Sequence, residues 1–547
     1  MKKSGKNSRA MRPITEIAFE AGIPGESLIP YGAHFAKVRA SLLHELKDKP
    51  DGRLIIVTAM SPTPAGEGKT TLTIGLTQAL RSLGKKAFAC IRQPSIGPLL
   101  GAKGGATGSG SSRVEPAEEI ALHFTGDDYA VSTSHNLVSS LIDNHIYHGN
   151  SLNMEKVLWK RVSPINDRSL RKVRIGLGKA AGEREEEFHI SAASELMAIL
   201  SLSADLADLK ERVSRTIVAL GKDGSAITVR DLKASGATAA LLKDALNPNL
   251  AQSIRGAPVF IHTGPFGNIS IGCSSLLSAK MALKLGEYVI TEAGFSTELG
   301  AEKFFDIVCR AGGLRPAAAV IVATLGALRL HGGASDYRAK NMKAALKGID
   351  NLRKHIENVA AFGLSAIVAL NRYKDDTDEE IDETLSNIRR LGCMAVAVDA
   401  RDLGAPGGIE AAEAVVKACS EENDFNFLYP LDLPIEEKVS TIARSIYGAE
   451  GAVFSAEARA DLERIERLGL SALPVCIAKT PKSLSDDPAL LGRPNGFNIN
   501  VREVRPATGA GYVVAVCGNV LLMPGMPEHP LAEEIDIDAS GRITGIR

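Results

Sequence analysis

The sequence predicts an α/β fold in which helices cover both faces of a mostly parallel sheet. Short runs of apolar and β-branched residues recur along the 547-residue chain, and helical patterns separate them. This alternation is typical of parallel strands joined by crossover helices. A glycine-containing loop directly after the first run supports the prediction, because ligand-binding loops in such folds follow the carboxyl ends of strands.

The apolar runs and the periodic segments between them give the expected elements. Strands are expected at Leu54–Ala59, Ala87–Ile91, Pro258–His262, Tyr288–Thr291, Ala318–Thr324, Ser365–Leu370 and Met394–Val398. Helices are expected at Leu72–Leu83, Ala193–Ala219, Ala279–Lys284 and Asn341–Phe362. Near the end of the chain, Lys479–Arg493 is rich in turn-forming residues and Glu503–Met523 has a strand-like composition.

The loop from Thr58 to Thr71 has the composition of a phosphate-binding loop. Its candidate nucleotide-binding residues are Thr63, Pro64, Ala65, Gly66, Glu67, Gly68, Lys69, Thr70 and Thr71. Backbone N–H groups of the loop and of the following helix would point at one place, where the helix dipole favours an anion. Lys69 would reach the terminal phosphates and the hydroxyl of Thr70 would bind Mg²⁺. The usual pattern has glycine where Thr63 stands, so we expect a variant loop in a P-loop NTPase-like fold.

These elements suggest a division of the chain into four segments. Residues 1–150 would form the first part of a nucleotide-binding domain and residues 256–370 its second part. Residues 151–255 are charged and interrupt the rhythm of strands, so we expect an inserted helical subdomain there. Residues 371–547 would form a smaller C-terminal α/β domain.

Composition excludes several classes of partner. The chain has 64 basic and 64 acidic side chains, so no net positive field is available to attract nucleic acid or an anionic membrane. Its longest apolar run, 317–328, is too short to span a bilayer. The seven cysteines are scattered and form no Cys-x-x-Cys pair, which favours a reducing compartment. We therefore expect a cytoplasmic protein without nucleic-acid or membrane partners.

Polar residues follow several of the expected strands. Arg92 and Gln93 follow the second strand, Glu292 follows the fourth, and Tyr373 follows the sixth. In a parallel sheet these positions lie along one edge. Glu292 could orient Mg²⁺ or a water molecule, or it could cap a helix. Each loop taken alone could be an ordinary turn, since turns prefer glycine and proline.

The order of these motifs resembles the formate–tetrahydrofolate ligase family over nearly the whole chain. The resemblance rests on the phosphate loop and on further short sequence motifs, among them Gly101–Ala106, His123–Asp127, Leu141–Ile146, Thr291–Phe295, Leu299–Phe304 and Ser483–Pro488. It implies that ATP, formate and tetrahydrofolate give 10-formyltetrahydrofolate, ADP and phosphate through formyl phosphate. It also implies Mg²⁺, activation by K⁺ or NH₄⁺, and a homotetramer.

The resemblance assigns roles to three residues outside the loop. Arg92 would hold formate and then formyl phosphate, because the planar fork of arginine suits both groups. Tyr373 matches one of the two aromatic rings between which the family holds the pterin, and Arg401 stands at the place of the second ring. Lys69 and Arg92 are thus the expected catalytic residues, with Tyr373 and Arg401 binding the folate.

Several family positions differ in this chain, and we expect the differences to affect the acceptor side of the reaction. They include Gln93 in place of a glutamate, the run Ser109–Ser112, and the residues Ile271, Ser274, Glu298, Val308 and Arg401. The loss of a carboxylate at Gln93 removes any general-base capacity there. Arginine at 401 can replace an aromatic ring only in part.

Two other functions remain open from the residues alone. One is a divergent acyl-phosphate ligase with a different acid or acceptor, and the other is a nucleotide-dependent switch ATPase. A metal site formed by Asp143, His145 and His148 is less favoured than a structural role, because no further ligands are evident. Asp486 and Asp487 are expected to shape a turn.

Overall fold

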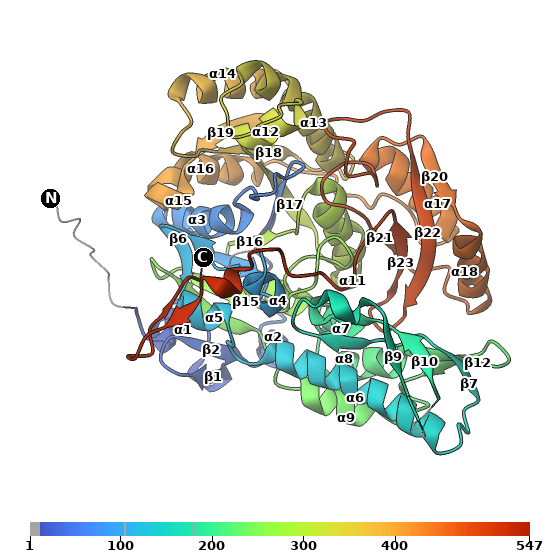
Figure 1. The fold of residues 1–547 in the computed structure, drawn as a ribbon. Helices are drawn as coiled ribbons and strands as arrows, with labels where there is room; N and C mark the ends of the chain where they lie inside the picture. The colour runs from blue at the N-terminus through green and yellow to red at the C-terminus, as the bar shows by residue number, and fades with distance from the viewer. Residues whose placement is uncertain (1–10, 103–105, 179–181, 547) are drawn as a thin grey trace.

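A computed structural model describes residues 11–102, 106–178 and 182–546 and is built around one twelve-stranded sheet (Figure 1). Seven of its strands run parallel, and they are the seven expected from the sequence, with ends shifted by at most two residues. In spatial order they are β15 (Pro258–Ile261), β4 (Ala87–Ile91), β16 (Tyr288–Glu292), β3 (Arg53–Ala59), β17 (Pro316–Ala323), β18 (Ala366–Asn371) and β19 (Met394–Val398). The predicted mixed α/β architecture with a mostly parallel sheet is confirmed.

Antiparallel strands extend the sheet beyond β15. They are β14 (Asn249–Ser253), β2 (Phe35–Val38) and β1 (Leu28–Tyr31), with β6 (Ser112–Glu115) and β5 (Gly108–Ser109) attached to β14. None of these strands was expected, because they are short and lack the continuous apolar runs of strands buried on both faces.

Both faces of the parallel part are buried, as the alternation of side chains along β3 shows. Ile55 and Val57 belong to one core cluster with Leu76 of α3 (Lys69–Ser82) and residues of α16 (Ile409–Ala418). Leu54 and Ile56 belong to another cluster, with residues of α10 (Leu276–Leu285) and α13 (Met342–Ala360). Helices on both faces therefore fix the sheet, and the loops at the carboxyl ends of its strands lie along one edge.

Other helices complete the architecture. They are α1 (Ile14–Glu20), α2 (Leu42–Glu45), α4 (Ile96–Leu100), α5 (Ala117–Ala121), α11 (Arg310–Gly312), α12 (Leu325–His331), α14 (Asp378–Arg389) and α15 (Ala400–Leu403). Three π-helical turns cover Thr297–Ala301, Phe304–Cys309 and Ala443–Tyr447. In the part of the chain that the structure describes, no helix has the length and hydropathy needed to cross a membrane.

The single helix expected over Ala193–Ala219 is wrong. The segment forms α7 (Glu195–Leu202), α8 (Leu206–Ser214) and the first residues of β12 (Ile217–Gly221). The break has a local cause, because Asp205 caps α8 by accepting a hydrogen bond from the backbone N–H of Asp208 at 2.8 Å. The β-branched Ile217 and Val218 then favour a strand.

Residues 151–255 are mixed rather than only helical. Besides α7, α8 and α9 (Ser235–Leu242), they contain short strands. These are β7 (Met154–Val157), β8 (Arg161–Ser163), β9 (Val173–Ile175), β10 (Arg184–Glu186), β11 (Phe188–Ile190), β12 and β13 (Ala226–Thr228). The range also contains β14, which belongs to the main sheet. The long helix α6 (Asp127–Tyr147) packs on α9, and Figure 1 shows this group beside the main sheet.

The C-terminal region has its own four-stranded sheet. Its order is β20 (Gly451–Phe454), β22 (Asn498–Ala507), β23 (Tyr512–Cys517) and β21 (Val475–Ala478), with α17 (Ile435–Ile442) and α18 (Ala456–Arg467) alongside. The strand-like segment Glu503–Met523 thus contributes to β22 and β23, and the turn-rich stretch after Lys479 contains neither helix nor strand. The tail, with β24 (Asp536–Ile537) and β25 (Ile543–Thr544), returns to the main domain, where the backbone N–H of Leu531 donates to the carbonyl of Gly101 at 2.7 Å.

Candidate active site

The predicted phosphate loop connects β3 to α3, and two glycines determine its course. Gly66 and Gly68 have φ angles of 81° and 76°, a region that other residues rarely adopt. At Gly68 a side chain would also collide with Asn371, whose Nδ2 lies 2.7 Å from the position of an added Cβ. Lys69 is the first residue of α3, so the loop ends at a helix N-terminus as the sequence predicted.

Contacts from the ends of β17 and β18 hold the loop from inside. The carboxylate of Glu67 is buried and accepts hydrogen bonds from the backbone N–H of Thr63, at 2.6 Å, and from the hydroxyl of Thr324. The side-chain amide of Asn371 donates to the carbonyl of Glu67 at 3.1 Å. Glu67 therefore points into the protein and shapes the loop, whereas Pro64, Ala65 and Gly66 are exposed.

A buried carboxylate joins the loop to the neighbouring strands. The hydroxyl of Thr70 donates to Glu292 at 2.6 Å, and the Nε of Arg92 lies 3.5 Å from the other carboxylate oxygen. Glu292 is the last residue of β16, and its side chain is 2% exposed. The side chain of Arg92 is 23% exposed, and its guanidinium also donates a hydrogen bond to the carbonyl of Pro265 at 3.3 Å. The structure thus brings Thr70, Arg92 and Glu292 together.

The charges of Glu292, Glu67 and Arg92 act on the ammonium of Lys69. Burial lowers the pKa of its ammonium, while the carboxylates of Glu292 and Glu67 act in the opposite direction and Arg92 adds to the lowering. The side chains of Lys69 and Arg92 and the buried carboxylate of Glu292 therefore lie around the N-terminus of α3, while the second buried carboxylate, that of Glu67, accepts hydrogen bonds from within the protein. This arrangement can neutralise an anion with several negative oxygens, such as a polyphosphate.

The oxygen donors in this group suit a hard divalent cation. The hydroxyl of Thr70 and the carboxylate of Glu292 are ligands that Mg²⁺ accepts, and Thr70 keeps lone pairs free while it donates to Glu292. Among the described residues, no group of three or more His, Cys, Asp or Glu side chains is placed to hold a metal ion. The residues therefore fit a Mg²⁺ ion that shares its coordination with bound phosphates.

Tyr373 and Arg401 lie near one another on the same side of the sheet. Burial raises the pKa of Tyr373 to about 12, the charge of Glu67 adds to the rise, and the charge of Arg401 opposes it. Arg401 is an exposed residue of α15, and its carbonyl accepts a hydrogen bond from the backbone N–H of Ser111 at 2.7 Å. Gly110 permits this contact, since an added Cβ would lie 2.2 Å from that carbonyl oxygen.

The residues that differ from the family pattern do not all lie on the edge that carries the loops. Ile271 and Val308 are buried in the main hydrophobic core. The hydroxyl of Ser274 donates to the carbonyl of His262 at 3.2 Å, and Glu298 lies in a buried polar cluster. Gln93 is close to the site, and its buried side-chain oxygen has no hydrogen-bond partner within the described residues.

The other residues considered as metal ligands or catalytic groups make contacts that stabilise the fold. Asp143 pairs with Arg161 and, at 2.6 Å, with Arg184, while the ring of His145 accepts a hydrogen bond from the backbone N–H of Leu152. Asp487 shapes a turn by accepting a hydrogen bond from the backbone N–H of Ala489 at 2.9 Å, whereas Asp486 accepts one from the backbone N–H of Asn500 in β22 at 3.0 Å and so ties its loop to that strand. Lys103, Gly104 and Gly105 of the Gly101–Ala106 motif lie outside the described residues.

Sequence reasoning missed the residues that hold the loop from inside. The sequence pattern places Thr324 at the end of a strand and Asn371 directly after one, without indicating that they contact the loop, although such contacts are expected at the carboxyl ends of parallel strands. His355, which accepts a hydrogen bond from the backbone N–H of Ser61 at 2.9 Å, lies in the middle of α13. Nothing in its local sequence indicates that contact.

The support that Thr324 gives to the loop can be tested by an isosteric pair of variants. Thr324→Val removes the hydroxyl that donates to Glu67 and caps α12, whereas Thr324→Ser keeps it. We expect Thr324→Val to weaken ATP binding by about 5- to 30-fold, or about 1–2 kcal/mol, because a buried carboxylate loses a donor. Calorimetric titration with ATP checks this, and equal affinities for the two variants would contradict the role.

Comparison with known proteins identifies the family of the chain. The family model described as formate–tetrahydrofolate ligase matches residues 4–547. A curated formate–tetrahydrofolate ligase from Bacillus licheniformis is 48% identical over 543 residues, which cover 98% of this chain and 97% of the relative. Because the match extends over the phosphate loop, the sheet and the C-terminal region, the chain belongs to the formate–tetrahydrofolate ligase family.

Proposed function

We propose that this chain catalyses the ATP-dependent ligation of formate to tetrahydrofolate, and that the group formed by Thr70, Arg92 and Glu292 is where formate is phosphorylated. Membership of the family supports the overall reaction. The observation that carries the assignment of the site is the buried carboxylate of Glu292, which contacts both the helix that would bind the phosphates and the arginine that would bind formate.

In the first step, a formate oxygen attacks the γ-phosphorus of ATP. A bond forms between that oxygen and phosphorus, the bond from phosphorus to the β-γ bridging oxygen breaks, and ADP leaves. Such a transfer depends mainly on positioning and on neutralising charge. Lys69 and the N-terminus of α3 would neutralise the phosphate oxygens, and Arg92 would hold formate in line.

Arg92 is well placed to hold formate, because hydrogen bonds orient its guanidinium. Glu292 and the carbonyl of Pro265 occupy two of its donor positions, and its other N–H groups have no protein partner in the described part of the chain. Those groups can bind the two oxygens of formate as a fork, and afterwards the oxygens of formyl phosphate. A Mg²⁺ ion bound with ATP would be held by Thr70 and Glu292 and would supply further charge neutralisation.

In the second step, N10 of tetrahydrofolate attacks the carbonyl carbon of formyl phosphate. The new C–N bond forms, the C–O bond to phosphate breaks, and the departing phosphate takes up the proton that N10 loses. Tyr373 would stack on one face of the pterin and the guanidinium of Arg401 on the other. Gln93, which is neutral, would contribute no general base to this step.

The proposal also includes the division into domains, the activating ion, the oligomeric state and the location of the protein. The nucleotide-binding region would be P-loop NTPase-like and composed of residues 1–150 and 256–370, with residues 151–255 inserted and residues 371–547 contributing to the folate site. Activation by K⁺ or NH₄⁺ and a homotetramer are part of the same proposal. A cytoplasmic location is also part of the proposal, and the scattered cysteines support it because they suit a reducing compartment.

The function is tested by product formation. Purified protein should form 10-formyltetrahydrofolate and ADP only when ATP, formate and tetrahydrofolate are all present. Lys69→Met should lower kcat at least about 100-fold, because a charge that stabilises the phosphoryl-transfer transition state is lost, while circular dichroism stays unchanged. ADP release that needs another acid or acceptor would indicate a divergent acyl-phosphate ligase, and slow release that needs neither would indicate a switch ATPase.

The acceptor side is tested at Arg401 and Gln93. An aromatic stack contributes about 0.5–1.5 kcal/mol beyond the area that it buries, or about two- to tenfold in affinity. We therefore expect Arg401→Trp to tighten tetrahydrofolate binding by that factor, and Gln93→Glu to raise the rate of formyl transfer. Titration with tetrahydrofolate and a single-turnover assay measure the two effects. Tight binding by the wild type that Arg401→Trp does not improve would contradict the proposed stacking.

A further inference from the structure

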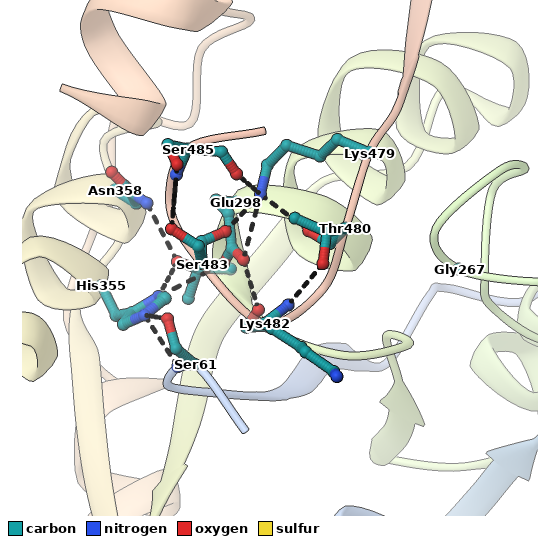
Figure 2. A network of polar contacts seen from close by, with 12 residues as sticks. Ser61, Gly267, Glu298, His355, Asn358, Lys479, Thr480, Lys482, Ser483 and Ser485 are labelled. Carbon is teal, nitrogen blue, oxygen red and sulfur yellow. Dashed lines mark hydrogen bonds and ion pairs between the residues drawn. The ribbon is translucent and has the colours of Figure 1, made fainter. Parts of the chain in front are cut away.

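A lysine ammonium lies fully buried beneath the active site, in a cage of oxygen atoms. Lys479 donates hydrogen bonds to the carbonyls of Thr480, Ser483 and Ser485, at 3.1, 2.5 and 3.3 Å. A carboxylate oxygen of Glu298, which is also fully buried, lies 3.8 Å from the ammonium. Figure 2 shows the ammonium among these groups, which come from the loop after β21 and from the π-helical turn Thr297–Ala301.

The cage continues to the phosphate loop through a buried histidine. The ring of His355 has one nitrogen 3.6 Å from the second carboxylate oxygen of Glu298 and 2.6 Å from the hydroxyl of Thr297. Its other nitrogen accepts a hydrogen bond from the backbone N–H of Ser61 at 2.9 Å, so the proton of the neutral ring lies on the side of Thr297 and Glu298. Burial lowers the pKa of His355 to about 3, and the charges of Lys354 and Lys479 contribute.

The cage also continues to the residues around Arg92 through a tightly folded segment. Five residues separate Glu298 from Glu292, and one of them, Gly294, lies against Gly300 so closely that an added Cβ at Gly300 would be 2.0 Å from the carbonyl oxygen of Gly294. Gly294 in turn lies beside Arg92, since a Cβ there would be 3.2 Å from the guanidinium Nη1. Glu298 therefore lies between the histidine that contacts Ser61 and the segment that packs beside Arg92.

We propose that Lys479 is a positioning residue, whose ammonium acts as a fixed internal cation that locks Glu298 and thereby the phosphate loop and the residues around Arg92. The proposal rests on the function proposed above for that loop. Lys479 touches none of the residues assigned to the nucleotide, formate or the pterin. It links the C-terminal region to the nucleotide site, and an ordered nucleotide site therefore requires that region to be docked.

The oxygen atoms of the cage, which are all hydrogen-bond acceptors, explain why a cation is needed there. Three carbonyl oxygens and a carboxylate would form a strongly negative pocket without the ammonium, and leaving Glu298 as an unpaired buried charge is costly. Burial lowers the pKa of Lys479 to about 8, against the opposing effect of Glu298. The same oxygens would accept a small ammonium ion in place of the side chain, which makes the proposal testable by chemical rescue.

The experiment measures ATP affinity of the full-length protein by calorimetry, together with the melting temperature. Lys479→Ala should raise the Kd for ATP at least about tenfold, corresponding to the loss of one well-placed interaction. Methylammonium should restore at least half of the lost binding free energy, and tetramethylammonium, which is too large for the cage, should not. Lys479→Met should weaken ATP binding equally but resist rescue, because its side chain fills the cavity.

Lys438 provides a matched control. It is also fully buried, it donates to the carbonyls of Ser471 and Leu473 at 2.6 and 3.1 Å, and burial lowers its pKa to about 8 as well. Its carbonyl partners belong to the C-terminal region, outside the path to the phosphate loop. Lys438→Ala should therefore lower the melting temperature without changing ATP affinity, and methylammonium should have no effect on its ATP binding.

The outcomes separate this proposal from the proposed function. Wild-type protein that binds no ATP would overturn the function itself. Wild-type protein that binds ATP, together with a folded Lys479→Ala variant of unchanged affinity, would overturn only the positioning role, as would lost affinity that methylammonium does not restore. If Lys479→Ala does not fold, Lys479→Met decides the matter, since unchanged ATP affinity in that variant contradicts the proposal.

Discussion

The carboxylate of Glu292 is the contact on which the rest of the site depends. It accepts a hydrogen bond from Thr70, at the start of the helix that follows the phosphate loop, and it pairs with Arg92 from the next strand. A buried carboxylate needs such partners, because an unpaired charge in the interior is costly. The same contacts that satisfy Glu292 therefore bring together the groups that we propose bind phosphate and formate.

The parallel sheet explains how residues far apart in sequence reach this place. β3, β4, β16, β17 and β18 all end on one edge, and their last residues or following loops supply Thr70, Arg92, Glu292, Thr324 and Asn371. Some of these groups face the site, and others face inward and shape the loop, as the contacts of Glu67 show. The inward contacts are as important as the outward ones, since a phosphate loop binds its ligand through backbone N–H groups that must already be oriented.

Local pattern was sufficient for the strands buried on both faces and for the phosphate loop. Continuous apolar runs identified the seven parallel strands, and Gly66, Gly68 and Lys69 identified the loop. Local pattern could not identify contacts between distant segments, such as that of His355 with Ser61, because a histidine within an amphipathic helix has the same local sequence whether or not it has a distant partner. Local pattern also did not show that Asp205 caps a new helix and so divides the expected helix in two. Nor did it show that Ile271 and Val308, which differ from the family pattern, lie in the core.

The central claim is that Glu292, with Thr70, serves the cation that accompanies ATP as well as holding Arg92. The most direct test is calorimetric titration of wild type and Glu292→Gln with ATP, in the presence of Mg²⁺ and in excess EDTA. Wild type should prefer the Mg²⁺ complex by at least about tenfold. Glu292→Gln should bind metal-free ATP as well as or better than wild type, because a negative charge near the phosphates is gone, and should lose most of that preference. An unchanged preference for the Mg²⁺ complex in Glu292→Gln would contradict the account.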